Sequence, residues 1–131
     1  MAEITIGPAI SFISAGFPSP AEYSTELSIN LDAHLIQNPS ATFMAYANGS
    51  SMVRVGIHHG DILIIDRSLN ARDGDVIIAL LNGEFTVKQV SIIDDILFLV
   101  PRNSQYTSVK ITSEMGFEVW GVVIYSIRKH R

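Results

Sequence analysis

The hydrophobic and polar positions change their spacing along the chain, and each change predicts a different element. Gly and Pro recur through residues 1–24, which predicts an extended arm. Between residues 27 and 37, Leu31, Leu35 and Ile36 share one side of a short helix. Asn30 is its expected N-cap, and Pro39 stops it.

From residue 41 onward the pattern becomes that of short strands. Residues 42–47 alternate weakly, and residues 52–57 are expected to form one or two helical turns. Residues 61–66 hold four consecutive apolar side chains, which is typical of a strand covered on both faces. Further strands are expected at 92–100, 109–112 and 117–127.

A β-hairpin formed by residues 76–81 and 84–90 is the clearest local prediction. Asn82-Gly83 supplies the positive φ angles that a two-residue type I′ turn needs. Counting outward from this turn pairs Leu81 with Glu84, Leu80 with Phe85 and Ile77 with Lys88. Many short antiparallel strands, one short helix and no βαβ rhythm predict a compact, mainly β domain.

Size and composition narrow the classes of protein. The chain has 131 residues, enough for one domain, and contains no Cys, so disulfide and thiolate chemistry are excluded. No membrane span is expected because no apolar run approaches about 18 residues, and the N-terminus lacks the basic region of a secretory signal. The net charge is −4 and the basic cluster RKHR at 128–131 is interpreted as a solvated end, so strong direct nucleic-acid binding is not expected.

Two side chains suggest chemistry: Ser51, which follows Gly49-Ser50 at a predicted turn, and Lys88, which lies in an apolar strand. A serine hydroxyl becomes nucleophilic when a neighbouring base takes its proton. A lysine can be that base only when neutral, and burial favours the neutral amine. The expected neighbours are apolar, namely Phe85, Val87, Val90 and, across the hairpin, Ile77. The alternative is an ordinary turn serine and a lysine whose charged end reaches water.

Other constellations in the chain are weaker. His58-His59-Gly60-Asp61 suggests a metal site or a Ser-His-Asp triad, but adjacent residues of an extended chain point to opposite faces. The chain has no G-x-S-x-G elbow, P-loop or dinucleotide-binding glycine pattern. We therefore expect neither a metal nor a cofactor.

Several longer blocks carry a resemblance to a known family. The chain resembles the LexA-like self-cleaving serine peptidases, and most closely their UmuD branch. The resemblance extends from residue 16 almost to the C-terminus, and it rests on the order and spacing of these blocks. They are AGFPSPAEY (15–23), LIQNPSATF (35–43), GSSM (49–52), GDILIIDRS (60–68), GDVIIALLNGEFTVKQV (74–90), PRNS (101–104) and FEVWGVVIYSI (117–127).

The resemblance implies a role for each matching residue. Ser51 is then the nucleophile, Lys88 the general base and Ala15–Gly16 the scissile bond. The backbone N–H groups of Ser50 and Ser51 are our candidates for the oxyanion hole. Residues 1–40 would form the arm with the cleavage site and short helix, and residues 41–131 the LexA-like peptidase domain.

The resemblance also implies partners and a setting. A RecA filament on single-stranded DNA would act as co-protease in the SOS response. The shortened product would form a homodimer and join a Y-family, UmuC-like polymerase subunit for translesion synthesis in the cytoplasm.

Two departures and two alternatives accompany this interpretation. Ser50 stands where the family often has an acidic residue, and the predicted arm before Gly16 is short. The alternative function is a non-enzymatic module that binds a polymerase and holds the Ser-Lys pair incidentally. A LexA-like repressor is disfavoured, because the 15 to 40 residues before the predicted domain leave no room for a helix-turn-helix.

Overall fold

The computed structural model describes residues 30–49, 52, 55–100 and 108–131. The predicted arm at 1–24 lies outside these residues, and so do two residues of the helical turns predicted at 52–57. The chain divides into two compact units, Met1–Pro39 and Ser40–Arg131. The first unit contributes one described helix, and the second contains the strands.

The helix α3 (Leu31–Leu35) begins at the predicted cap. Asn30 has extended backbone angles, and its side-chain oxygen accepts a hydrogen bond from the Ala33 N–H at 3.1 Å. This bond satisfies one of the N–H groups that a helix start leaves without a partner. The helix ends at Leu35, before the predicted limit of residue 37, because Ile36 returns to an extended conformation.

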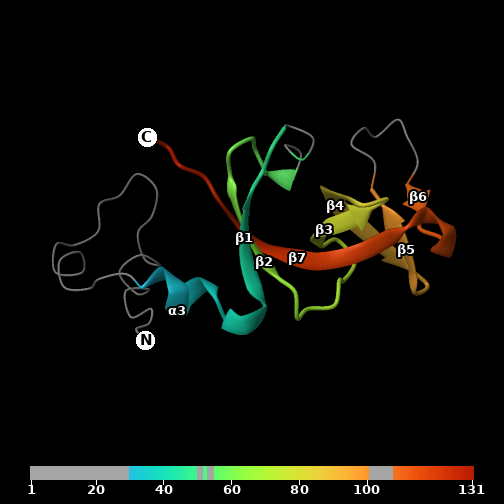
Figure 1. The fold of residues 1–131 in the computed structure, drawn as a ribbon, viewed down its shortest axis with the longest axis horizontal. Coiled ribbons are helices and arrows are strands. Elements are labelled where there is room, and N and C mark those ends of the chain that lie inside the picture. The colour runs from blue at the N-terminus through green and yellow to red at the C-terminus, as the bar shows by residue number, and fades with distance from the viewer. Residues whose placement is uncertain (1–29, 50–51, 53–54, 101–107) are drawn as a thin grey trace. The chain divides into compact units, whose positions relative to one another are not determined.

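Seven strands form one antiparallel sheet in the described part of the second unit, in the order β1-β2-β7-β3-β4-β5-β6. Figure 1 shows β7 as a long ribbon that runs between β2 and β3. The prediction of a mainly β, antiparallel domain is confirmed. The strands are β1 (Thr42–Tyr46), β2 (Ile62–Asp66), β3 (Val76–Leu81), β4 (Glu84–Ile93), β5 (Ile96–Leu99), β6 (Val109–Lys110) and β7 (Phe117–Ile127).

The hairpin β3–β4 has the register that the sequence predicts. Leu81 faces Glu84, Leu80 faces Phe85 and Ile77 faces Lys88. Asn82 and Gly83 both have positive φ, 51° and 84°, as a type I′ turn requires.

The prediction of a single strand at 92–100 is wrong. The chain turns at Asp94 and Asp95, so that Ile93 of β4 faces Ile96 of β5. Both aspartates have positive φ, 52° and 64°, a conformation that a short polar side chain tolerates better than a bulky one. The apolar residues on each side hid this second tight turn, and the strand predicted at 109–112 is likewise reduced to Val109–Lys110.

Alternation along β3 separates two apolar clusters. Successive residues of a strand point to opposite faces, so Ile78 packs on one face, and Ile77 and Ala79 pack on the other. We call the cluster around Ile78 the pocket-side cluster, because several of its members line the pocket described below, and the cluster around Ile77 the hairpin-side cluster. The buried members of the pocket-side cluster are Ala47, Ile57, Leu63, Ile65 and Ile78. Those of the hairpin-side cluster are Ile77, Ala79, Val90, Leu99 and Val122.

Gly121 lets β7 approach β2 closely. A Cβ atom at this position would lie 2.5 Å from Cγ2 of Ile65, a distance at which one of the two residues must shift. Its missing side chain therefore makes room for a buried residue of the pocket-side cluster.

Candidate active site

A pocket of about 390 Å³ borders both sequence motifs that suggested chemistry. Asn48, Gly49 and Met52, which flank Ser50-Ser51, line one part of it. Phe85, Thr86 and Val87, which directly precede Lys88, line another. The remaining lining residues are Ala45, Tyr46, Ala47, Ile57, Leu63, Ile65, Ile78 and Trp120. Residues distant in sequence thus meet at one cavity because β1, β2, β3, β4 and β7 are neighbours in the sheet.

Lys88 occupies the predicted position on β4, and its side chain is half-buried. It lies opposite Ile77, which is 0% exposed, and shares its strand face with Val90, which is 1% exposed. The other two expected neighbours, Phe85 and Val87, alternate to the opposite face. The described structure therefore gives the lysine an apolar setting on one side.

Lys88 lies on the face of β4 that meets the hairpin-side cluster, opposite the face on which Val87 packs against the pocket-side cluster. Thr86 lies two positions earlier on β4, on the same face as Lys88, and lines the pocket. Lys88 itself does not belong to the lining.

Four predicted site residues lie outside the described part of the chain. These are Ser50 and Ser51, the proposed oxyanion-hole and nucleophile residues, and Ala15 and Gly16, the proposed scissile pair. Their roles stay predictions.

Hydrogen bonds close the segment that carries the serines. The Ala47 N–H donates to the Asp61 carbonyl and the Gly60 N–H donates to the Ala47 carbonyl, both at 2.8 Å. The Gly49 N–H donates to Nδ1 of His59 at 2.9 Å. The two ends of the segment 47–61, which contains the GSSM motif, are therefore held together.

A buried carboxylate anchors the same segment. Asp61 is 2% exposed and forms a salt bridge with Arg128, with 3.1 Å between Nε of Arg128 and Oδ1 of Asp61. The His58 N–H donates to the other carboxylate oxygen at 2.8 Å, and Nη2 of Arg128 donates to the Gly56 carbonyl at 2.9 Å. The hydrogen bond from Arg128, followed by that from His58, holds the pKa of Asp61 below its usual value of 3.8.

The basic C-terminal cluster is thus more than a solvated end. Arg128 reaches back from the residue after β7 to the segment that follows the GSSM motif. The one residue in the sequence that could have indicated this contact is Asp61. A carboxylate at the start of an apolar strand needs a partner when it is buried.

The lowered pKa of Asp61 predicts how stability depends on pH. The stabilisation is complete above the usual pKa of 3.8 and is lost as the pH falls through the lowered pKa of the folded state. We expect Asp61→Asn to lower the midpoint of thermal unfolding at pH 7, and this deficit to shrink as the pH falls below that usual value. Circular dichroism melts across acidic pH measure it, with the exposed Asp95→Asn as control. A deficit that stays constant with pH would contradict the assignment.

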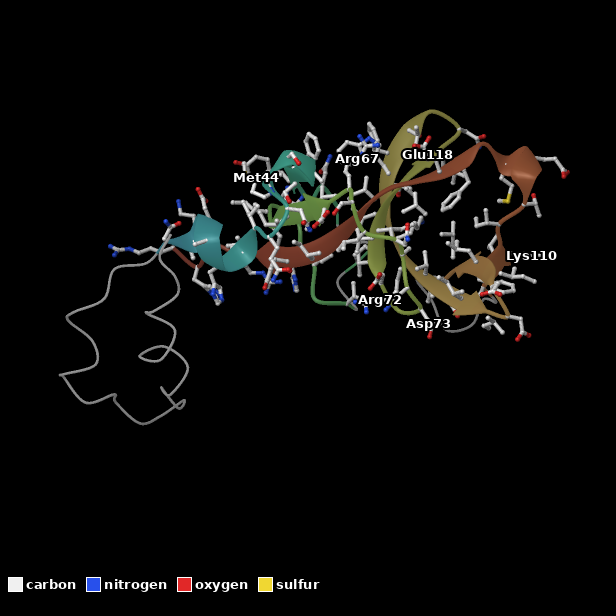
Figure 2. The ribbon with its side chains drawn as sticks, turned by 90° about the horizontal axis from the view of Figure 1, so that it is seen from below. Met44, Arg67, Arg72, Asp73, Lys110 and Glu118 are labelled. Atoms are coloured by element: carbon white, nitrogen blue, oxygen red, sulfur yellow. The ribbon has the colours of Figure 1, made fainter. Side chains whose placement is uncertain are left out.

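An aromatic group forms one wall of the pocket. The Trp120 ring lies 5.4 Å from the Phe43 ring and 5.5 Å from the Phe85 ring, measured between centroids. Arg67, labelled in Figure 2, stacks its guanidinium 4.2 Å from the Trp120 ring centre and donates from Nε to the Trp120 carbonyl at 2.8 Å. No sequence pattern predicted these contacts, since they join three strands and the residue after β2.

The two adjacent histidines have separate partners. His59 accepts from Gly49, whereas the ring of His58 contacts Arg128 and the Gly56 carbonyl. Within the described residues, no group of three His, Asp or Glu side chains is placed to hold a metal ion. The helix in the same part of the chain is too short to cross a membrane.

Comparison with known proteins places these features in a family. The Peptidase S24-like family model matches residues 8–124. MucA of Salmonella typhimurium is 40% identical over 119 residues, which cover 90% of this chain and 81% of MucA. ImpA of the same organism is 45% identical over 76 residues, 58% of this chain and 52% of ImpA.

A repressor also matches. The LexA repressor of Oleidesulfovibrio alaskensis is 32% identical over 117 residues, which cover 89% of this chain and 56% of the repressor. The matched region includes the pocket and both flanking motifs. The chain therefore belongs to the Peptidase S24-like family, as a UmuD-type member with the LexA-like fold.

Proposed function

We propose that this protein is a self-cleaving serine peptidase of the SOS response that cuts its own Ala15–Gly16 bond. The observation that carries the proposal is a pocket bordered both by the residues around Ser50-Ser51 and by those before Lys88. Membership of a peptidase family supports a hydrolytic role for this pocket.

In the proposed mechanism, the neutral amine of Lys88 takes the proton of the Ser51 hydroxyl while its oxygen attacks the Ala15 carbonyl carbon. The backbone N–H groups of Ser50 and Ser51 are proposed to bind the oxyanion that forms. The C–N bond to Gly16 then breaks, and the amine of Gly16 leaves with the proton from Lys88. Water hydrolyses the acyl-enzyme and releases Ser51.

The same proposal assigns a role to each part of the chain. Residues 1–40 would supply the arm that is cut, and residues 41–131 the peptidase. A RecA filament on single-stranded DNA would accelerate the cut in the cytoplasm by favouring the reactive conformation. The shortened product would join a UmuC-like Y-family polymerase subunit.

Mass spectrometry of the purified full chain tests the proposal. Incubation at alkaline pH is expected to produce a fragment beginning at Gly16, and the rate should rise with pH because only a neutral amine accepts the serine proton. Chelation of metal ions should leave the rate unchanged. Without such a fragment at any pH or with RecA filaments, the non-enzymatic polymerase-binding module becomes the better interpretation.

The proposed homodimer is supported by exposed apolar side chains on β1 and β7, the two strands that flank β2. Met44, Ile64 and Tyr125 form one cross-strand row, and Tyr46, Ile62 and Ile127 form the next. Both rows lie on the face opposite the pocket-side cluster, although Tyr46 also borders the pocket. Met44 and Tyr46 are 60% and 67% exposed on the edge strand β1, whereas Ile64 between Met44 and Tyr125 is buried. Figure 2 labels Met44 on this strand. Apolar patches of this kind mark interaction surfaces.

A charge placed on this face is expected to separate the two copies. Tyr46→Glu should shift the mass measured by light scattering from dimer to monomer, because a carboxylate buried in an apolar interface loses its hydration. Ile93→Glu is the matched control, since Ile93 is 56% exposed on β4, which does not belong to this face. A Tyr46→Glu protein that stays dimeric would show that the copies associate elsewhere.

A further inference from the structure

One side chain takes part in closing the segment that carries the GSSM motif. Nδ1 of His59 lies 2.9 Å from the backbone nitrogen of Gly49, at an N–H···N hydrogen bond. Gly49 lines the pocket and immediately precedes Ser50-Ser51. His59 therefore acts on the backbone of the motif from ten positions later in the chain.

The chemistry of this contact is specific. A neutral imidazole accepts at one ring nitrogen only, so Nδ1 must carry the lone pair and Nε2 the proton. Gly49 has a φ of 93°, a backbone conformation that residues with a side chain rarely adopt. The His59 side chain is exposed, so burial of its ring does not explain its position.

The hydrogen bonds of Ala47 explain why the contact between His59 and Gly49 matters for the GSSM motif. Ala47 is already fixed by its bonds to Gly60 and Asp61, and Asp61 is held in turn by Arg128. Beyond Ala47, the bond to His59 is the next one toward the serines among the bonds that join described residues. We propose that His59 is a positioning residue that sets the direction in which the chain enters Ser50-Ser51, and so aligns the nucleophile for self-cleavage.

This inference rests on the proposed function, and a matched pair of variants tests it. His59→Asn keeps an acceptor, because the amide oxygen of Asn branches from Cγ as Nδ1 of His does. His59→Leu has a similar branched shape without an acceptor. We expect His59→Leu to slow cleavage of the full chain at alkaline pH about 3- to 10-fold, the factor that one net hydrogen bond represents. His59→Asn should restore most of the wild-type rate.

A second measurement follows the contact without relying on cleavage. In the uncleavable Ser51→Ala protein, hydrogen exchange of the Gly49 amide is read by nuclear magnetic resonance. Protection should fall when His59→Leu is added and persist with His59→Asn. Because His59 is exposed, both variants are expected to stay folded, and the dispersion of the same spectra checks this.

The outcomes separate this inference from the proposed function. If wild-type cleavage depends on Ser51 but the Leu and Asn variants cut at equal rates, the positioning role is overturned and the peptidase stands. Unchanged Gly49 protection in His59→Leu overturns it as well. If the wild type never cleaves, both the peptidase and the positioning role fail, even where the Gly49 protection confirms the contact.

Discussion

Replacing Ser51 with alanine is expected to abolish the fragment that begins at Gly16. The proposed reaction passes through an ester with the Ser51 oxygen, and alanine has no atom that can form it. The loss should therefore exceed that from any other single substitution at the site. Intact-mass spectrometry after prolonged alkaline incubation, with and without RecA filaments, measures it.

Lys88 variants test the base in the same assay. Lys88→Ala should slow cleavage about 10²- to 10⁴-fold, the usual contribution of a positioned general base. Lys88→Arg keeps the positive charge and much of the length, but a guanidinium does not deprotonate at accessible pH. Comparable losses in both variants indicate proton transfer, whereas an active Lys88→Arg protein would indicate that only charge is needed.

The neighbouring serine supplies the control. Ser50→Ala leaves Ser51 and the backbone N–H groups in place, so cleavage should continue at a similar rate. The reverse result, an inactive Ser50→Ala protein and an active Ser51→Ala protein, would identify Ser50 as the nucleophile. If a protein with both Ser51→Ala and Lys88→Ala still cleaved itself, the Ser-Lys dyad could not be the catalytic group.

The largest expected effect on stability comes from Ile77→Ala. Ile77 is 0% exposed in the hairpin-side cluster and faces Lys88 across β3 and β4. Truncation removes buried methyl groups and leaves a cavity, which lowers the free energy of unfolding by about 2–5 kcal/mol. Equilibrium unfolding in urea measures the change.

Ile93→Ala is the matched control for this substitution. It makes the same chemical change at the end of β4, where the side chain is 56% exposed. Its expected effect stays within about 0.5 kcal/mol. Equal losses in the two variants would mean that Ile77 is less buried in solution than in the structure.

Much of the fold could be predicted because its signals are local. Asn82-Gly83 determines a two-residue turn, and the turn determines which residues of β3 and β4 face each other. Asn30 likewise predicts the start of α3 through a bond three residues away. Local rules failed at Asp94-Asp95, where apolar residues on both sides read as one continuous strand.

Some features of the site could likewise be predicted from local sequence, whereas others depend on contacts between distant segments. A serine after a turn and a lysine in an apolar strand were recognisable in the sequence, and with the flanking blocks they predicted the family that the comparison confirms. No local pattern predicted that Arg128 would bind Asp61 or that Trp120 would stack with Phe43, Phe85 and Arg67. Such contacts depend on which strands become neighbours.

By itself the sequence determined the family, the β3–β4 register and the residues to test as nucleophile, base and scissile bond. Only the tertiary structure decided that Phe85 to Val87 and the residues around Ser50-Ser51 border one pocket, and that His59 and Arg128 hold the segment beside it. The physical reason is the range of the interactions. Turn angles and caps act within a few residues, whereas burial and hydrogen bonding between distant segments exist only once β7 has joined β2 to β3.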